Sequence, residues 1–101
     1  MPETCFRICW PDGTLETCYS PSLVVKDFLL PGETYPLADF VARSRMALDI
    51  ASDRVEAKYG WRCSRAAAQL VRIETAAAAF SGLPNARVTV EAFDEGGVAN
   101  R

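Results

Sequence analysis

Apolar and polar residues alternate over residues 4–10, which is the pattern of a strand with one buried face. The apolar face of this strand carries Phe6, Ile8 and Trp10. A Pro-Asp-Gly turn follows, and a second strand over residues 15–19 completes a hairpin.

Two registers of this hairpin are compatible with the sequence. A type I turn with a glycine bulge places Cys18 beside Phe6, whereas a loop that is one residue longer places Tyr19 there. A slip of one residue exchanges the two faces of a strand. The pattern therefore leaves open whether Cys18 or Tyr19 belongs to the core.

Two later segments repeat apolar residues with the 3.6-residue period of amphipathic helices. The first covers residues 36–59 and ends at Gly60, a residue type that is common at helix C-termini. The second runs from Ser64, which we expect to be its N-cap, to about Phe80. The short connection between the two helices predicts that they are antiparallel neighbours.

The remaining segments complete an α+β fold. Residues 21–29 form either a short helix with Ser20 as its N-cap or a short strand, and residues 87–93 alternate as a final strand. One face of that final strand is expected to carry Val88, Val90 and Ala92. The order β-β-(short helix or strand)-α-α-β predicts a small antiparallel sheet, the N-terminal hairpin plus the C-terminal strand, packed on two long antiparallel helices. We expect residues 1–93 to form a single domain and residues 94–101 a flexible tail.

Composition restricts the function more than the fold. Half of the residues are apolar, 24% are charged, and the formal net charge is −2, so there is no basic excess for nucleic acid. No apolar run approaches the ~20 residues that span a membrane, and the N-terminus lacks a signal-peptide pattern. We therefore expect a cytoplasmic protein that binds neither nucleic acid nor a membrane.

The chain contains no histidine, which excludes a Ser-His-Asp or Cys-His catalytic pair. Four cysteines are present without a C-x-x-C spacing. Cys5 and Cys9 share one face of a strand about 13 Å apart, which is too far for a disulfide or for a shared zinc ion. We expect no metal, no cofactor and no catalytic residue.

A first candidate site lies at the start of the second predicted helix, where Arg62 and Arg65 flank Ser64. Two guanidinium groups beside free backbone N–H groups suit a carboxylate or phosphate. In the alternative interpretation, the arginines pair with Asp53 or Glu56 of the preceding helix.

Polar residues also gather at the exit of the hairpin, near a possible helix start that could hold an anion. They are Cys18, Tyr19, Ser20, Ser22, Lys26 and Asp27. A small enzyme or a ligand carrier would use these groups, whereas helix capping and turn formation explain them more simply.

The second predicted helix is apolar around most of its circumference, with Arg65, Gln69 and Arg72 on one stripe. A small monomer can bury only part of such a helix, and exposed apolar surface is typical of interfaces. The residues that are hardest to place inside are Ala68, Val71, Ala78 and Ala79. We expect them to contact a second copy of the chain or a partner enzyme.

Several runs of residues within 1–80 are distinctive. They are FRI at 6–8, WPDG at 10–13, ETCYSPS at 16–22, YPL at 35–37, ASDRV at 51–55 and KYG at 58–60. They resemble a small bacterial family of nitrogen-starvation-response proteins. Genes of that family lie beside those of a nitrilase, a radical-SAM protein, an acetyltransferase-like protein and a flavin-dependent oxidoreductase.

The resemblance implies a role in scavenging nitrogen from nitriles or cyanide-like compounds, and it carries over no catalytic residue. Together with the missing acid–base machinery, it suggests a non-catalytic accessory or regulatory protein that acts through protein–protein interaction. The alternative is a small enzyme or a small-anion-binding protein of the same pathway.

Overall fold

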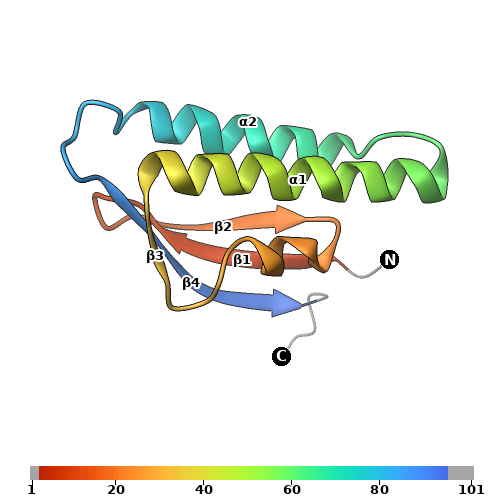
Figure 1. Ribbon diagram of the computed structural model, residues 1–101, viewed down its shortest axis with the longest axis horizontal. Coiled ribbons are helices and arrows are strands. Elements are labelled where there is room, and N and C mark those ends of the chain that lie inside the picture. Colours follow the sequence, from red (N-terminus) through yellow and green to blue (C-terminus); the bar gives the residue numbers. More distant parts are fainter. Residues whose placement is uncertain (1–2, 96–101) are drawn as a thin grey trace.

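A computed structural model describes residues 3–95 as a four-stranded antiparallel sheet with two α-helices on one face (Figure 1). The elements are β1 (Thr4–Cys9), β2 (Leu15–Ser20), the 3₁₀-helix η1 (Leu23–Asp27), β3 (Thr34–Pro36), α1 (Leu37–Tyr59), α2 (Ser64–Ala78) and β4 (Arg87–Glu95). The strand order is β2-β1-β4-β3. The predicted α+β class and its element order are confirmed, and β3 is an additional strand.

The hairpin has the shorter of the two expected turns. Trp10 N donates to Thr14 O at 2.8 Å, and Gly13 adopts a φ of 89°, the left-handed conformation that this turn requires. Phe6 is consequently paired with Cys18. Cys18 is buried in the core, whereas Tyr19 is only partly buried.

Residues 21–29 contain a helix and not a strand, but its N-cap differs from the prediction. Ser22 is the N-cap, and its Oγ accepts a hydrogen bond from Val24 N at 3.2 Å. Ser20 is the last residue of β2, and its Oγ donates to Ser22 O at 2.7 Å across the turn that follows. The expectation for Ser20 was wrong because this hydroxyl closes the turn and leaves the cap to the second serine.

Both long helices form where they were predicted, with one difference at an end. α1 ends at Gly60, whose φ is 88°. The N-cap of α2 is Cys63 and not Ser64, and no side chain caps this end. Ser64 instead becomes the first helical residue. In the part of the chain that the structure describes, neither helix has the length and apolar character needed to cross a membrane.

The final strand contains a β-bulge at Glu91, where its register with β1 shifts. Beyond the bulge the two faces of the strand exchange, so Phe93 packs against the core and Ala92 is exposed. The prediction that Ala92 continues the face of Val88 and Val90 is wrong for this reason. β4 runs to residue 95, and the rest of the expected tail lies outside the described residues.

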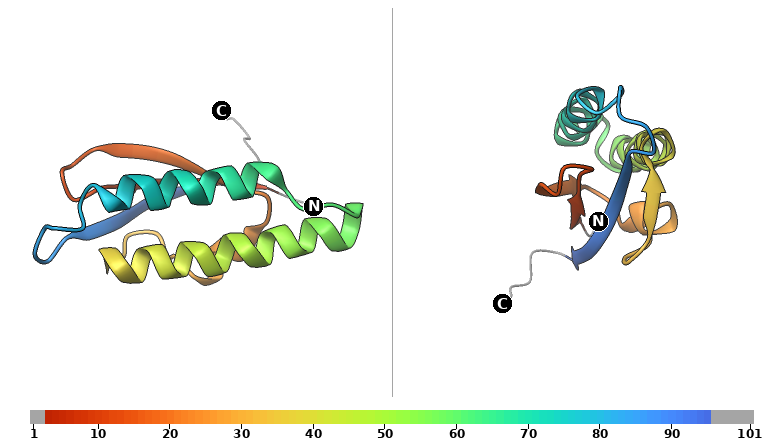
Figure 2. Two further views of the ribbon diagram at one scale, coloured as in Figure 1. Left: turned by 90° about the horizontal axis from the view of Figure 1, so that it is seen from above. Right: turned by 90° about the vertical axis from the view of Figure 1, so that its left-hand side faces the viewer.

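The core lies between the sheet and the helices, which cover the same face of the sheet in both views of Figure 2. Trp10 belongs to this core and is stacked on Phe80 and edge-on to Phe40, with ring centroids 5.8 Å apart in each pair. The largest fully buried side chains around it include Phe6, Ile8, Leu29, Leu48 and Ile73. This packing anchors both helices and so determines which of their residues remain on the surface.

The polar stripe of α2 covers the outer edge of β2. Gln69 Oε1 accepts a hydrogen bond from Tyr19 N at 2.9 Å, and Arg72 Nε donates to Glu16 Oε2 at 2.8 Å. Arg65 lies over the ring of Tyr19. An edge strand otherwise offers its backbone groups to other chains, so this stripe protects the sheet from edge pairing.

Candidate functional site

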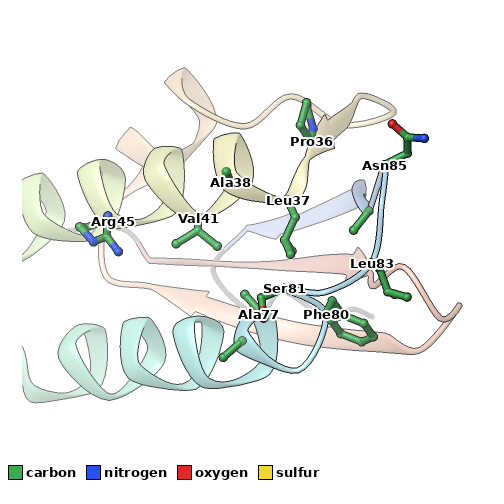
Figure 3. A pocket seen from close by; sticks show the side chains of 12 residues that line it. Pro36, Leu37, Ala38, Val41, Arg45, Ala77, Phe80, Ser81, Leu83 and Asn85 are labelled. Atoms are coloured by element: carbon green, nitrogen blue, oxygen red, sulfur yellow. The ribbon is translucent and has the colours of Figure 1, made fainter.

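An apolar groove of about 650 Å³ opens where α1 begins and α2 ends (Figure 3). Leu37 and Val41 project from α1 toward the α2 side of the groove, which is formed by Ala77 and Phe80, and Leu83 lies at its far end. The other lining residues are Pro36, Ala38, Arg45, Ala78, Ser81, Asn85 and Ala86.

Charge is scarce in this groove. Of the described residues that line it, Arg45 alone is charged, and its guanidinium is already engaged, 2.7 Å from Glu74 Oε2. The groove therefore suits apolar side chains of a binding partner better than a charged substrate.

The outward face of α2 continues this groove along the helix. Ala68, Val71, Ala78 and Ala79 are all exposed, and the side chain of Val71 is 61% accessible. Ala78 also lines the groove, so the two surfaces are continuous. The structure thus brings together the four residues that the sequence singled out as an interface, and it adds the groove at their end.

The arginines at the start of α2 have different partners within the chain. Arg62 donates to Asp49 at 2.9 Å and also to Asp53 and Glu56. The hydrogen bond that Arg62 donates to Asp53 is the main reason why the pKa of Arg62 lies above its ordinary value. The guanidinium of Arg65 lies 3.9 Å from the centroid of the Tyr19 ring. Ser64, between the two arginines, is exposed.

The polar residues at the hairpin exit serve the fold. Ser20 and Ser22 are buried and hydrogen-bonded to each other, and Arg54 Nη1 donates to Ser22 Oγ at 3.3 Å. Burial of Cys18 raises the pKa of its thiol to about 12, so the group is not a reactive thiolate. Lys26 Nζ lies 5.7 Å from the centroid of the Phe93 ring.

A second hollow, of about 340 Å³, lies at the opposite end of the helices, near the turn between α1 and α2. Tyr19, Tyr59, Trp61, Cys63 and Glu3 line it together with Pro21 and Val55. Of these residues, only Tyr19 was predicted from the sequence as a ligand-binding candidate. The available signal was a pair of aromatic residues on either side of the glycine that ends α1. Among residues 3–95, no cluster of His, Cys, Asp or Glu side chains is arranged to hold a metal ion.

These features define a small two-layer α+β protein with an apolar helix face and a hollow at each end of its helix pair. A model of the family described as nitrogen starvation-induced protein NitG matches residues 5–93 of the chain. The chain belongs to this family, and its role lies in the response to nitrogen starvation. Comparison with curated proteins and with solved structures gave no match.

Proposed function

We propose that the protein is a non-catalytic accessory or regulatory protein of a nitrile-utilising pathway that is induced by nitrogen starvation. It acts by binding another protein, either an enzyme encoded beside it or a second copy of itself. The observation that carries this proposal is the apolar outward face of α2 with its adjoining groove.

The composition of this face supports an interface. Three of its four named residues are alanines, whose small side chains allow a second helix to approach closely. Val71 offers a larger apolar side chain at the centre, with 61% of it exposed. Apolar groups in such a position gain about 25 cal/mol for each Å² that a partner removes from water.

The groove supplies the second half of the surface. A side chain of a partner helix, such as leucine or phenylalanine, fits between Leu37, Val41 and Phe80 in the manner of a helix bound in a groove. Such a side chain would act as an anchor at one end of the alanine-rich face of α2. It would fix the orientation of the partner and increase its affinity.

A charge placed on this face tests the proposal. Val71→Glu and Ala68→Glu put an unpaired carboxylate where the partner would bury it, and each should weaken association at least about 10-fold. Ala57→Glu, at an exposed position near the opposite end of α1 from the groove, is the matched control and should leave association unchanged.

Two measurements distinguish the two kinds of partner. Light scattering of the purified protein detects self-association, and calorimetry with the purified nitrilase, radical-SAM protein and flavin-dependent oxidoreductase detects a foreign partner. Dissociation of a dimer by V71E identifies a second copy as the partner. A monomer that binds none of the enzymes refutes the proposal, as does binding that both glutamate variants retain.

A further inference from the structure

A further hollow, of about 460 Å³, lies on the seam where α1 and α2 run side by side, and we call it the seam hollow. Its α2 wall is apolar and includes Ala66, Ala67 and Leu70. Its α1 wall contains Asp49 and Ser52. Because the two helices are antiparallel neighbours, the groove and the seam hollow lie along one line between them (Figure 2).

The spacing between the groove and the seam hollow is the same on both helices. On α1, Ser52 in the seam hollow lies 11 residues after Val41 in the groove. On α2, Ala78 in the groove lies 11 residues after Ala67 in the seam hollow. Eleven residues are three helical turns, or about 16 Å. A straight helix placed along the seam can therefore put residue i into the groove and residue i+11 into the seam hollow.

An ion pair separates the groove from the seam hollow. Nε and Nη2 of Arg45 donate to Glu74 Oε2 at 3.0 and 2.7 Å, and this pair connects α1 to α2 across the seam. Both side chains are partly exposed. An occupant of the seam must therefore offer a small or polar residue at this level and apolar residues on either side of it. An amphipathic helix with apolar residues three turns apart meets this requirement.

Acidic side chains gather at the seam hollow and give this end of the seam a negative charge. Arg62 donates hydrogen bonds to Asp49 and to two further carboxylates of α1, so three carboxylates surround one guanidinium. The neighbouring basic residues Lys58 and Arg65 lie over tyrosine rings instead. A partner with a basic side chain just beyond the seam hollow is therefore complementary in charge.

We propose that the seam binds one amphipathic α-helix of the partner protein, with apolar residues at i, i+4 and i+11 and a lysine or arginine at i+15. The first two apolar residues enter the groove beside Val41 and Phe80, the third enters the seam hollow beside Leu70, and the basic residue reaches Asp49. Trp61 lines neither the groove nor the seam hollow. This inference rests on the proposed function and adds the element by which the partner docks.

Two synthetic helical peptides of identical composition test the spacing. Both contain three leucines and one lysine in an alanine-rich host. The first peptide has leucines at i, i+4 and i+11 and lysine at i+15, whereas the second has leucines at i, i+5 and i+10, on three different sides of the helix. Calorimetry should give a Kd of about 100 μM or lower for the first peptide and at least about 10-fold weaker binding for the second. Circular dichroism confirms that both peptides are equally helical.

Two glutamate variants locate the bound peptide. Ala38→Glu in the groove and Ala67→Glu in the seam hollow each place an exposed residue's new carboxylate beside an apolar side chain of the peptide. Each should weaken binding of the first peptide at least about 10-fold. Thr17→Glu, an exposed position of β2 on the face of the sheet away from the helices, is the matched control and should leave binding unchanged.

The outcomes separate this inference from the proposed function. Equal binding of the two peptides, no binding of the first at about 1 mM, or binding that neither Ala38→Glu nor Ala67→Glu weakens overturns the helix inference. If Val71→Glu still weakens association with a second copy or an enzyme in that case, the proposed function stands and the partner docks by another element. If neither the first peptide nor any protein partner binds, both are refuted.

Discussion

Truncation of a buried aromatic residue, Trp10→Ala, should lower the free energy of unfolding by about 3–5 kcal/mol. Only 3% of the Trp10 side chain is exposed, and its ring is stacked on Phe80 and edge-on to Phe40. Both contacts are lost together. Phe40 belongs to α1 and Phe80 to the turn directly after α2, so the cavity cannot close without moving α1 or that turn.

The loss of a hydrogen bond adds to this decrease in stability. Trp10 Nε1 donates to Glu16 Oε1 at 2.8 Å, and the other carboxylate oxygen of Glu16 accepts from Arg72. The side chain of Glu16 is only 15% exposed, so water replaces the lost donor incompletely. A domain of this size has a total stability of about 5–15 kcal/mol. The variant should therefore lose a large part of its stability, and its melting temperature should fall by roughly 12 °C or more.

Urea denaturation followed by circular dichroism measures this effect. Trp61→Ala is a natural control because this tryptophan is 68% exposed, and its replacement should change stability by no more than about 0.5 kcal/mol. In each variant the remaining tryptophan reports on unfolding by fluorescence. A midpoint of Trp10→Ala close to that of the unmodified protein, at an equal m-value, refutes the reasoning, since the core would then not depend on this ring.

Two further predictions concern side chains that the sequence nominated for chemistry. Because Arg62 and Arg65 already have partners, 20 mM phosphate should leave the melting temperature unchanged, and a rise that disappears in the double glutamine variant would establish the anion site. Cys18 should resist thiol labelling in the folded protein, as mass spectrometry of the labelled peptides would show. Its pKa is about 12 when folded and near 9.0 when unfolded. Stability should therefore be insensitive to Cys18 below pH 9 and fall between pH 9 and 12, less so in Cys18→Ala.

The helices and the hairpin could be predicted because each rests on a long or chemically distinct signal. α1 repeats its apolar positions over six turns and ends at Gly60, and the hairpin contains a turn that only glycine completes easily. β3 could not be predicted, because a strand of three residues next to a helix has no periodicity of its own. The bulge at Glu91 could not be predicted from the sequence either, because one extra residue leaves a strand-like pattern on both sides of it.

The candidate surfaces also differ in whether the sequence could predict them. The exposed positions of Ala68, Val71 and Ala79 could be predicted from the sequence, because the excess of apolar residues on one helix is a local property. The hollow near the turn between α1 and α2 could not be predicted, because its walls come from residues that are distant in sequence, such as Glu3, Tyr19 and Trp61. Only the fold brings those segments together, through the hairpin edge and the turn between the helices.

The position of α2 explains why only one of its faces is free to bind a partner. One face of the helix packs on the core through Ile73, and a second face holds the edge of β2 through Gln69. The third face, centred on the exposed Val71, continues through Ala78 into the groove near the end of the helix. The turn between α1 and α2 lies at the other end of the helix pair (Figure 1). Val71→Glu should therefore weaken association, whereas Trp61→Leu, at the turn, should leave it unchanged. If Trp61→Leu weakened association as strongly, the docking surface would have to extend to the turn, and the assignment of the groove as its end would be wrong.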